Sequence, residues 1–98
     1  MNKEEKLERW AKIEAMIRPI LENLKKDNSN FSIELVEDFL ENNELGLALE
    51  TIVSSLGDNL SKSDISAIID TAKFMGYDNS EDKSDMLTWQ TLMDLDSK

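Results

Sequence analysis

The residue types best placed to do chemistry in this sequence are carboxylates, which recur at helical spacing between residues 34 and 44. They are Glu34, Glu37, Asp38, Glu41 and Glu44. Side chains three and four residues apart lie on one flank of a helix, so these groups could act together on a cation. No Lys or Arg occurs between residues 27 and 61, so no neighbouring cation relieves their repulsion. Two interpretations remain open: a solvated helix flank, or a docking face for a cationic protein.

More acidic residues and one tryptophan outside residues 34–44 belong to the same expected docking face. They are Asp58, Asp64, Asp82, Asp85 and Trp89. Trp89 is included because tryptophan is enriched among the residues that dominate binding energy at interfaces. Helical spacing also favours a partly buried position for both Trp10 and Trp89.

The residue types that are missing exclude several classes of reaction. The chain has no Cys and no His. Disulfides, thiolate metal sites and cysteine nucleophiles therefore cannot form, and the commonest general base and nitrogen ligand are lacking. We expect no catalytic residue, no cofactor and no metal site, and we expect that the protein is not an enzyme.

Carboxylates could also bind calcium or act as an acid–base pair. An EF-hand loop that started at Asp78 would place Lys83 at its glycine position and Trp89 at its final carboxylate position, so this pattern fails. A hydrolytic carboxylate pair needs a cleft with two different environments. A helical chain of 98 residues offers little room for a deep cleft.

Net charge predicts the kind of partner. The chain has 11 basic and 21 acidic residues, a net charge of −10 and a sequence pI near 4.3. Residues 1–26 contain seven basic and five acidic side chains, whereas residues 27–98 contain four basic and sixteen acidic ones. Such a surface repels nucleic acid and anionic lipid and attracts a basic protein. With no apolar leader and no apolar run long enough to cross a bilayer, a cytoplasmic protein is expected.

Amphipathic helices must position these groups. Apolar steps of three and four predict a first helix over residues 4–26, in which Pro19 either kinks the helix or begins a second one. A turn is expected at residues 27–30, and Ser32 is the expected N-cap of a second helix that ends near Asn42 and Asn43. Its expected buried stripe is Ile33, Leu35, Val36, Phe39 and Leu40.

Three further helices are predicted. One covers residues 44–56, with Gly57 as a left-handed C-cap. The next begins at Ser61, with Asp64 spaced as in a capping box, and ends before Gly76. Residues 77–85 are expected to form a loop, followed by a short helix capped by Ser84. The sum is a single all-α domain over residues 1–98, a compact bundle of four to five short helices.

Gly46 falls inside the third predicted helix, where glycine costs about 1 kcal/mol relative to alanine. We expect that a close helix approach beside Ala48 explains why glycine occurs at this position.

Residues 41–50 read Glu-Asn-Asn-Glu-Leu-Gly-Leu-Ala-Leu-Glu, and a Ser-capped helix follows that closes on Phe74-Met75-Gly76-Tyr77. This ordered combination, over residues 33–77, resembles the MafI-type immunity proteins of bacterial polymorphic and contact-dependent toxin systems. The resemblance implies a cytoplasmic antitoxin that binds and neutralises one cognate toxin, often a nuclease with a basic cleft. It also implies that Glu44, Gly46 and Ala48 set a helix junction rather than touch the toxin.

The leading hypothesis is therefore an immunity protein that inhibits a basic toxin domain through its acidic surface. Two alternatives remain: an acidic nucleic-acid mimic that blocks several DNA-binding proteins, and a regulatory adaptor. Neither nucleic acid nor a membrane is expected as a partner. The free protein could be a monomer or a homodimer.

Overall fold

Five α-helices account for nearly all of the described chain, which comprises residues 3–27 and 33–98 of this computed structural model. The helices are α1 (Lys3–Asp27), α2 (Ile33–Glu41), α3 (Leu45–Leu56), α4 (Lys62–Phe74) and α5 (Lys83–Asp96). Short 3₁₀ turns follow α3 at Gly57–Asn59 and α4 at Tyr77–Asn79. No strand occurs in the described residues, so the prediction of an all-α bundle is confirmed.

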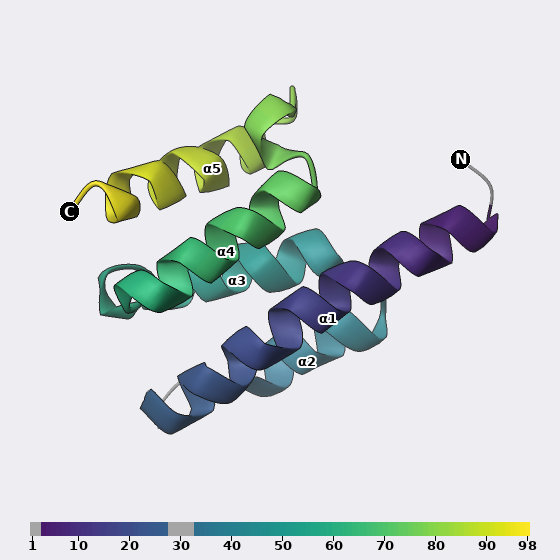
Figure 1. The fold of residues 1–98 in the computed structure, drawn as a ribbon, viewed down its shortest axis with the longest axis horizontal. Helices are drawn as coiled ribbons and strands as arrows, with labels where there is room; N and C mark the ends of the chain where they lie inside the picture. The colour runs from purple at the N-terminus through teal and green to yellow at the C-terminus, as the bar shows by residue number, and fades with distance from the viewer. Residues whose placement is uncertain (1–2, 28–32) are drawn as a thin grey trace.

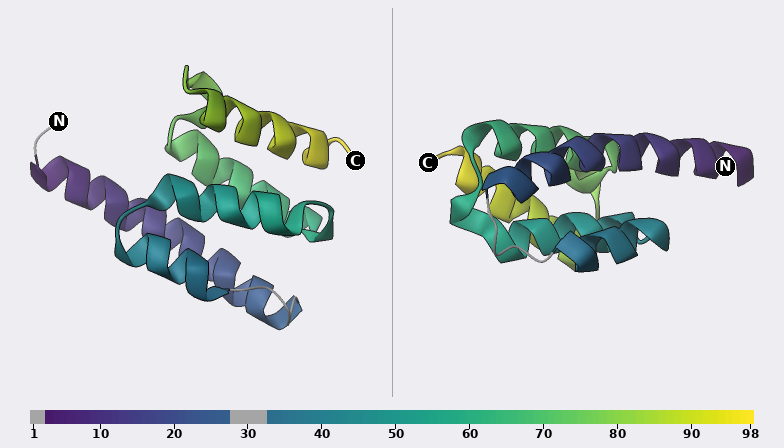
Figure 2. Two further views of the ribbon diagram at one scale, coloured as in Figure 1. Left: turned by 180° about the vertical axis from the view of Figure 1, so that it is seen from behind. Right: turned by 90° about the horizontal axis from the view of Figure 1, so that it is seen from below.

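The helices form two layers with α5 at one edge. Figures 1 and 2 show α1 beside α4 in one layer and the α2–α3 hairpin behind them. α5 packs along α4 and also contacts α3. α3 and α5 run in the same direction, so their first turns lie at the same end of the molecule (Figure 1). The radius of gyration, 13.0 Å, is that of a single packed domain of this size.

Pro19 lies inside α1 without ending it, so the alternative of a separate second helix at this point is wrong. Proline cannot donate the helical hydrogen bond to the carbonyl of Ala15. Both residues are exposed, so water can solvate that carbonyl. The opposite side of the same helix is buried, and tertiary packing there outweighs the local cost. The buried side chains are Ile13, Ile17, Ile20, Leu21 and Leu24.

α3 is the most buried helix and lies against α1, α2 and α5. Its buried residues are Leu45, Ala48, Leu49, Ile52, Val53 and Leu56. Trp10 and Trp89 are half-buried and pack against this core, as their spacing predicted. The predicted buried stripe of α2 is wrong at Leu35, which is 49% exposed. The buried residues of α2 are Val36 and Leu40.

The end of α2 and the start of α3 are joined by a Schellman motif. The backbone N–H of Glu44 donates to the carbonyl of Phe39 at 2.8 Å, and that of Asn43 donates to Leu40 at 3.1 Å. Asn43 adopts a φ of 58°, a left-handed conformation that asparagine tolerates better than most residues. The predicted end of this helix is thus confirmed. Of the turn predicted over residues 27–30, Asp27 is the last residue of α1, and the rest of that turn and the predicted Ser32 cap lie outside the described residues.

Caps fix the other helix ends. Ser61 caps α4 as predicted: its Oγ accepts from the backbone N–H of Asp64 at 3.1 Å. α5 differs, because its cap is Asp82 rather than Ser84. The Asp82 Oδ1 accepts from the backbone N–H groups of Ser84 and Asp85 at 2.9 and 3.2 Å, so α5 begins inside the predicted loop.

Glycines follow α3 and α4. Gly76 is left-handed with a φ of 88°, whereas the C-cap Gly57 has a positive φ of 34° outside the left-handed helical region. None of the described helices is both long and apolar enough to span a bilayer.

Candidate functional site

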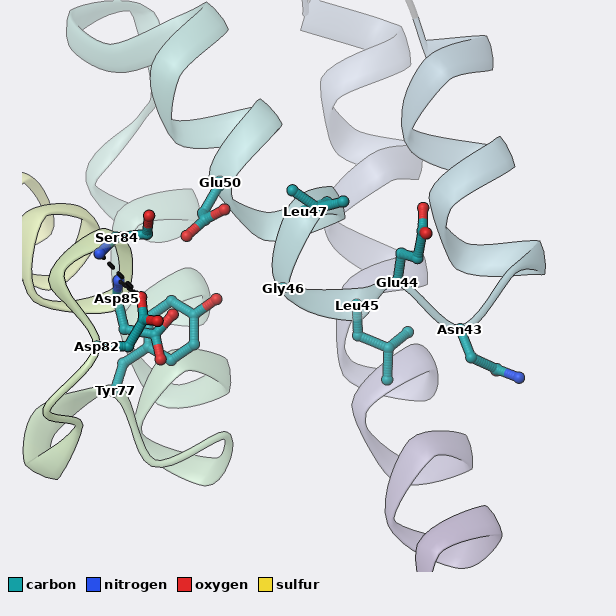
Figure 3. Close-up of a pocket in the computed structure, with 10 residues that line it drawn as sticks. All are labelled: Asn43, Glu44, Leu45, Gly46, Leu47, Glu50, Tyr77, Asp82, Ser84 and Asp85. Carbon is teal, nitrogen blue, oxygen red and sulfur yellow. Dashed lines mark hydrogen bonds between the residues drawn. The ribbon is translucent and has the colours of Figure 1, made fainter.

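A shallow cleft of about 430 Å³ opens where the first turn of α3 faces the first turn of α5 (Figure 3). Its α3 side is formed by Asn43, Glu44, Leu45, Gly46, Leu47 and Glu50. Its α5 side is formed by Tyr77, Asp82, Ser84 and Asp85. The parallel direction of α3 and α5 produces this cleft, since it places both N-terminal ends side by side.

Four carboxylates line the cleft, and no Lys or Arg is among its lining residues. Glu44, Asp82 and Asp85 were predicted as contact residues. The fold brings them to one cleft, although Glu44 and Asp82 are 38 residues apart in the sequence. Each lies at a helix N-terminus, where the helix dipole favours negative charge. In Figure 3 the Glu50 carboxylate points toward Ser84, and Glu44 lies at the opposite rim.

Hydrogen bonds within the α5 side hold Asp85 in place. The Ser80 hydroxyl donates to Asp85 Oδ2 at 2.7 Å and accepts from the backbone N–H of Asp82 at 3.1 Å. Asp85 and Tyr77 both line the cleft, and the charge of Asp85 contributes to the raised pKa of Tyr77. Burial and the nearby carboxylates raise the pKa of Tyr77 far above its ordinary value, so its hydroxyl remains a proton donor.

Glu50 is the half-buried carboxylate on the α3 side of the cleft. Burial raises its pKa, and the negative charges of Asp85 and Asp82 raise it further. A hydrogen bond with Thr88 of α5 acts in the opposite direction. Glu50 therefore faces uncompensated negative charge across the cleft, which a cation placed between the two sides would relieve.

Gly46 allows the start of α3 to approach Tyr77. A Cβ at residue 46 would lie 2.9 Å from the Tyr77 hydroxyl oxygen. The predicted close approach is therefore real, but its partner is this hydroxyl rather than a helix beside Ala48. Gly46 and Tyr77 both belong to the pattern that carries the family resemblance.

The carboxylates of α2 form a second group. Glu34, Asp38 and Glu41 are exposed, whereas Glu37 is half-buried. Lys25 of α1 places its Nζ 3.4 Å from Glu37 Oε1. The expectation that nothing relieves the repulsion on this flank is thus wrong for Glu37, because packing supplies a cation from outside residues 27–61.

The other predicted contact residues lie apart from both groups. Asp58 follows the far end of α3 and is paired with Lys98, whose Nζ lies 2.7 Å from Asp58 Oδ1. Asp64 is buried, with 4% exposure, so it presents little surface to a partner. Trp89 is half-buried against the core. The predicted residues therefore do not form one continuous face.

The cleft residues that sequence reasoning did not predict as contact residues include Leu47, Glu50 and Tyr77. Leu47 is 46% exposed and falls outside the buried periodicity of α3, which is the signal that could have identified it. Tyr77 gave no such signal, because its position depends on how α4 and α5 are joined.

No family model, curated protein or solved structure matches this chain. Among residues 3–27 and 33–98, no group of three or more His, Cys, Asp or Glu side chains is arranged to hold a metal ion. The charge and shape of the cleft are therefore the basis for its proposed function.

Proposed function

We propose that this protein is an immunity protein that binds one basic toxin domain in the bacterial cytoplasm and neutralises it without covalent chemistry. The observation that carries the proposal is the unpaired negative charge at the α3–α5 cleft and along α2. Binding would cover the toxin's basic cleft or lock the domain beside it.

Charge pairing inside the described part of the chain supports this proposal. Glu14, Glu22, Glu37 and Asp58 each have a Lys or Arg nitrogen within 4.0 Å. None of the four cleft carboxylates is among them, nor are Glu34, Asp38 and Glu41. Negative charge that is not used inside a protein remains available to attract a basic partner.

Electrostatic attraction of this kind acts mainly on association. It can raise the association rate constant well above the ordinary range of about 10⁵–10⁶ M⁻¹s⁻¹ at low salt. If the toxin is a nuclease, the same carboxylates would compete with phosphate groups for its basic residues. The resemblance to MafI-type proteins adds support, since its quoted residues include Glu44, Gly46 and Tyr77 of the cleft.

The test uses the toxin domain encoded by the neighbouring gene. We expect co-expression of this protein to protect cells and the purified pair to form a complex measurable by calorimetry. Reversal of Glu34, Asp38 and Glu41 to Lys should weaken binding if the α2 flank contributes. Reversal of Asp70, Asp78 and Asp96 to Lys, which changes the net charge equally elsewhere, is the matched control.

The outcomes separate the alternatives. Absence of both protection and complex formation would contradict the proposal. Binding to several unrelated basic proteins, with steep loss of affinity as salt increases, would indicate a nucleic-acid mimic instead. Binding to a partner that is not a toxin would indicate a regulatory adaptor.

A further inference from the structure

Two hollows lie along the line where α3 and α5 meet, and we refer to them, together with the surface between them, as the α3–α5 groove. The acidic cleft lies at one end of it, and a second hollow of about 360 Å³ lies at the other, between Ser54, Asp58, Thr91 and Lys98. No residue of α4 lines either hollow, so both open on the side of α3 and α5 that α4 leaves uncovered. α3 has 12 residues, so at about 1.5 Å per residue the groove is about 18 Å long.

Several side chains along this groove are short or polar. On α3, Glu50 and Ser54 lie four residues apart and face it. On α5, Ser84 lines one hollow and Thr91 the other, and Thr88 lies between them in the sequence. The two hollows and the surface between them span about three helical turns, a length that a helix or an extended segment of a partner could cover.

One exposed leucine on each of α3 and α5 accompanies the residues that line the groove. Leu47 on α3 is 46% exposed and lines the cleft. Leu87 is 67% exposed, and it lies three residues after Ser84 and four before Thr91, so helical spacing places it on the same side of α5 as these two lining residues. These side chains gain little from the fold of the free protein, because their apolar surface remains in water. A partner that covered them would gain that burial.

We propose that the α3–α5 groove is the docking surface for a cationic, amphipathic segment of a partner protein. Its apolar side chains would pack on Leu47 and Leu87, and its Lys or Arg side chains would meet Glu50, Asp82 and Asp85. The inference deepens the proposed function and rests on it for the partner's identity: the segment would belong to the toxin domain.

Charge complementarity selects this occupant over a second copy of the chain. Among the described residues that line the groove, Lys98 is the one cation, and it is already paired with Asp58 at 2.7 Å. A second copy would bring the same carboxylates together, and each copy has a net charge of −10. Like charges placed opposite each other at an interface reduce affinity.

The test uses two synthetic helical peptides of equal length and charge, one amphipathic and built from Lys and Leu, the other from Lys and Ala. Binding to the full chain is followed by NMR chemical-shift changes and by calorimetry. We expect the Lys–Leu peptide to bind more tightly and to shift resonances of Leu47, Glu50, Ser84 and Leu87. The double variant Leu47→Ala/Leu87→Ala should lose about ten-fold in affinity.

The matched control is Leu35→Ala, which truncates an equally exposed leucine on α2 and should change the affinity less than two-fold. Thermal unfolding of each variant checks that the fold is intact. Shifts confined to α2, equal binding of both peptides, or no loss in the double variant would overturn the inference. A concentration-dependent dimer that the double variant abolishes would also overturn it, and would assign the groove to a second copy.

Failure of this inference and failure of the proposed function are distinguishable. If the groove binds the Lys–Leu peptide as described but the neighbouring toxin neither binds nor is inhibited, the docking surface stands and the toxin assignment fails. If the toxin is neutralised equally by the double variant, the immunity function stands and the docking surface lies elsewhere.

Discussion

The Tyr77 hydroxyl oxygen lies 2.9 Å from the position that a Cβ on Gly46 would occupy. This contact joins the first turn of α3 to the turn that follows α4, two segments that are 31 residues apart in the sequence. Both residues line the acidic cleft, in which Tyr77 lies between Gly46 and the carboxylates of Asp82 and Asp85 (Figure 3). The geometry of the cleft therefore depends on the absence of a side chain at Gly46.

Gly46→Ala should destabilise the protein, although alanine is the better helix former. The new methyl group would displace a buried hydroxyl, for which we expect a loss of about 1–2 kcal/mol in the free energy of unfolding. Urea denaturation followed by circular dichroism measures it. In a Tyr77→Phe background the clash is removed, so the same substitution should become neutral or stabilising by up to about 1 kcal/mol. An equal loss in both backgrounds would show that the hydroxyl is not the obstacle.

Glu50→Gln should stabilise the protein at neutral pH. The pKa of Glu50 is raised in the folded state, so the folded state binds more protons than the unfolded state and stability falls as pH rises through this range. The variant lacks this penalty, and we expect a rise in Tm of about 1–3 °C at pH 7. Below the ordinary glutamate pKa both states are protonated and the difference should disappear.

Glu34→Gln is the matched control for this pH dependence. Glu34 lies in the first turn of α2, where the helix dipole favours its charge, so its loss should lower stability by a few tenths of a kcal/mol. Scanning calorimetry from pH 4 to 8 compares the two variants. A Glu50→Gln variant that is less stable than the original protein at pH 7 would contradict the explanation that burial and the nearby Asp85 and Asp82 disfavour the charge of Glu50.

Asp82→Ala should cost about 1 kcal/mol of stability, because it removes the cap of α5. Asp82→Ser should retain most of that stability, since serine also caps helices well, while it removes one charge from the cleft. Ser84→Ala, at the cap position predicted from the sequence, should change stability little. Denaturation midpoints check the three values, and a larger loss for Ser84→Ala than for Asp82→Ala would contradict the observed cap.

Lys25→Gln should change stability by less than about 0.5 kcal/mol, because its contact with Glu37 is a partly exposed ion pair. The substitution leaves the Glu37 charge without its partner. If the α2 flank attracts a basic toxin domain, the association rate constant should increase at low salt, as stopped-flow fluorescence would show. An unchanged or slower association would indicate that the α2 flank does not face the partner.

The helices themselves could be predicted from the sequence, because the interactions that define them are local. Periodic apolar residues, the Ser61 cap and the glycine after α4 act within a few residues along the chain. The end of α2 is of the same kind, since the Schellman hydrogen bonds of Asn43 and Glu44 reach no further than Phe39. Two local predictions were wrong: the burial of Leu35 and the choice of Ser84 as the cap of α5. In both places the packing of neighbouring helices decides which of several local signals is used.

The surplus of negative charge was likewise determined by the sequence alone, but its grouping was decided by the tertiary structure. Packing of α1 on α2 gave Glu37 a partner in Lys25, and burial removed Asp64 from the surface. The parallel course of α3 and α5 brought Glu50 to Asp82 and Asp85. Contacts between residues so far apart depend on how whole helix faces fit together, which no local pattern encodes.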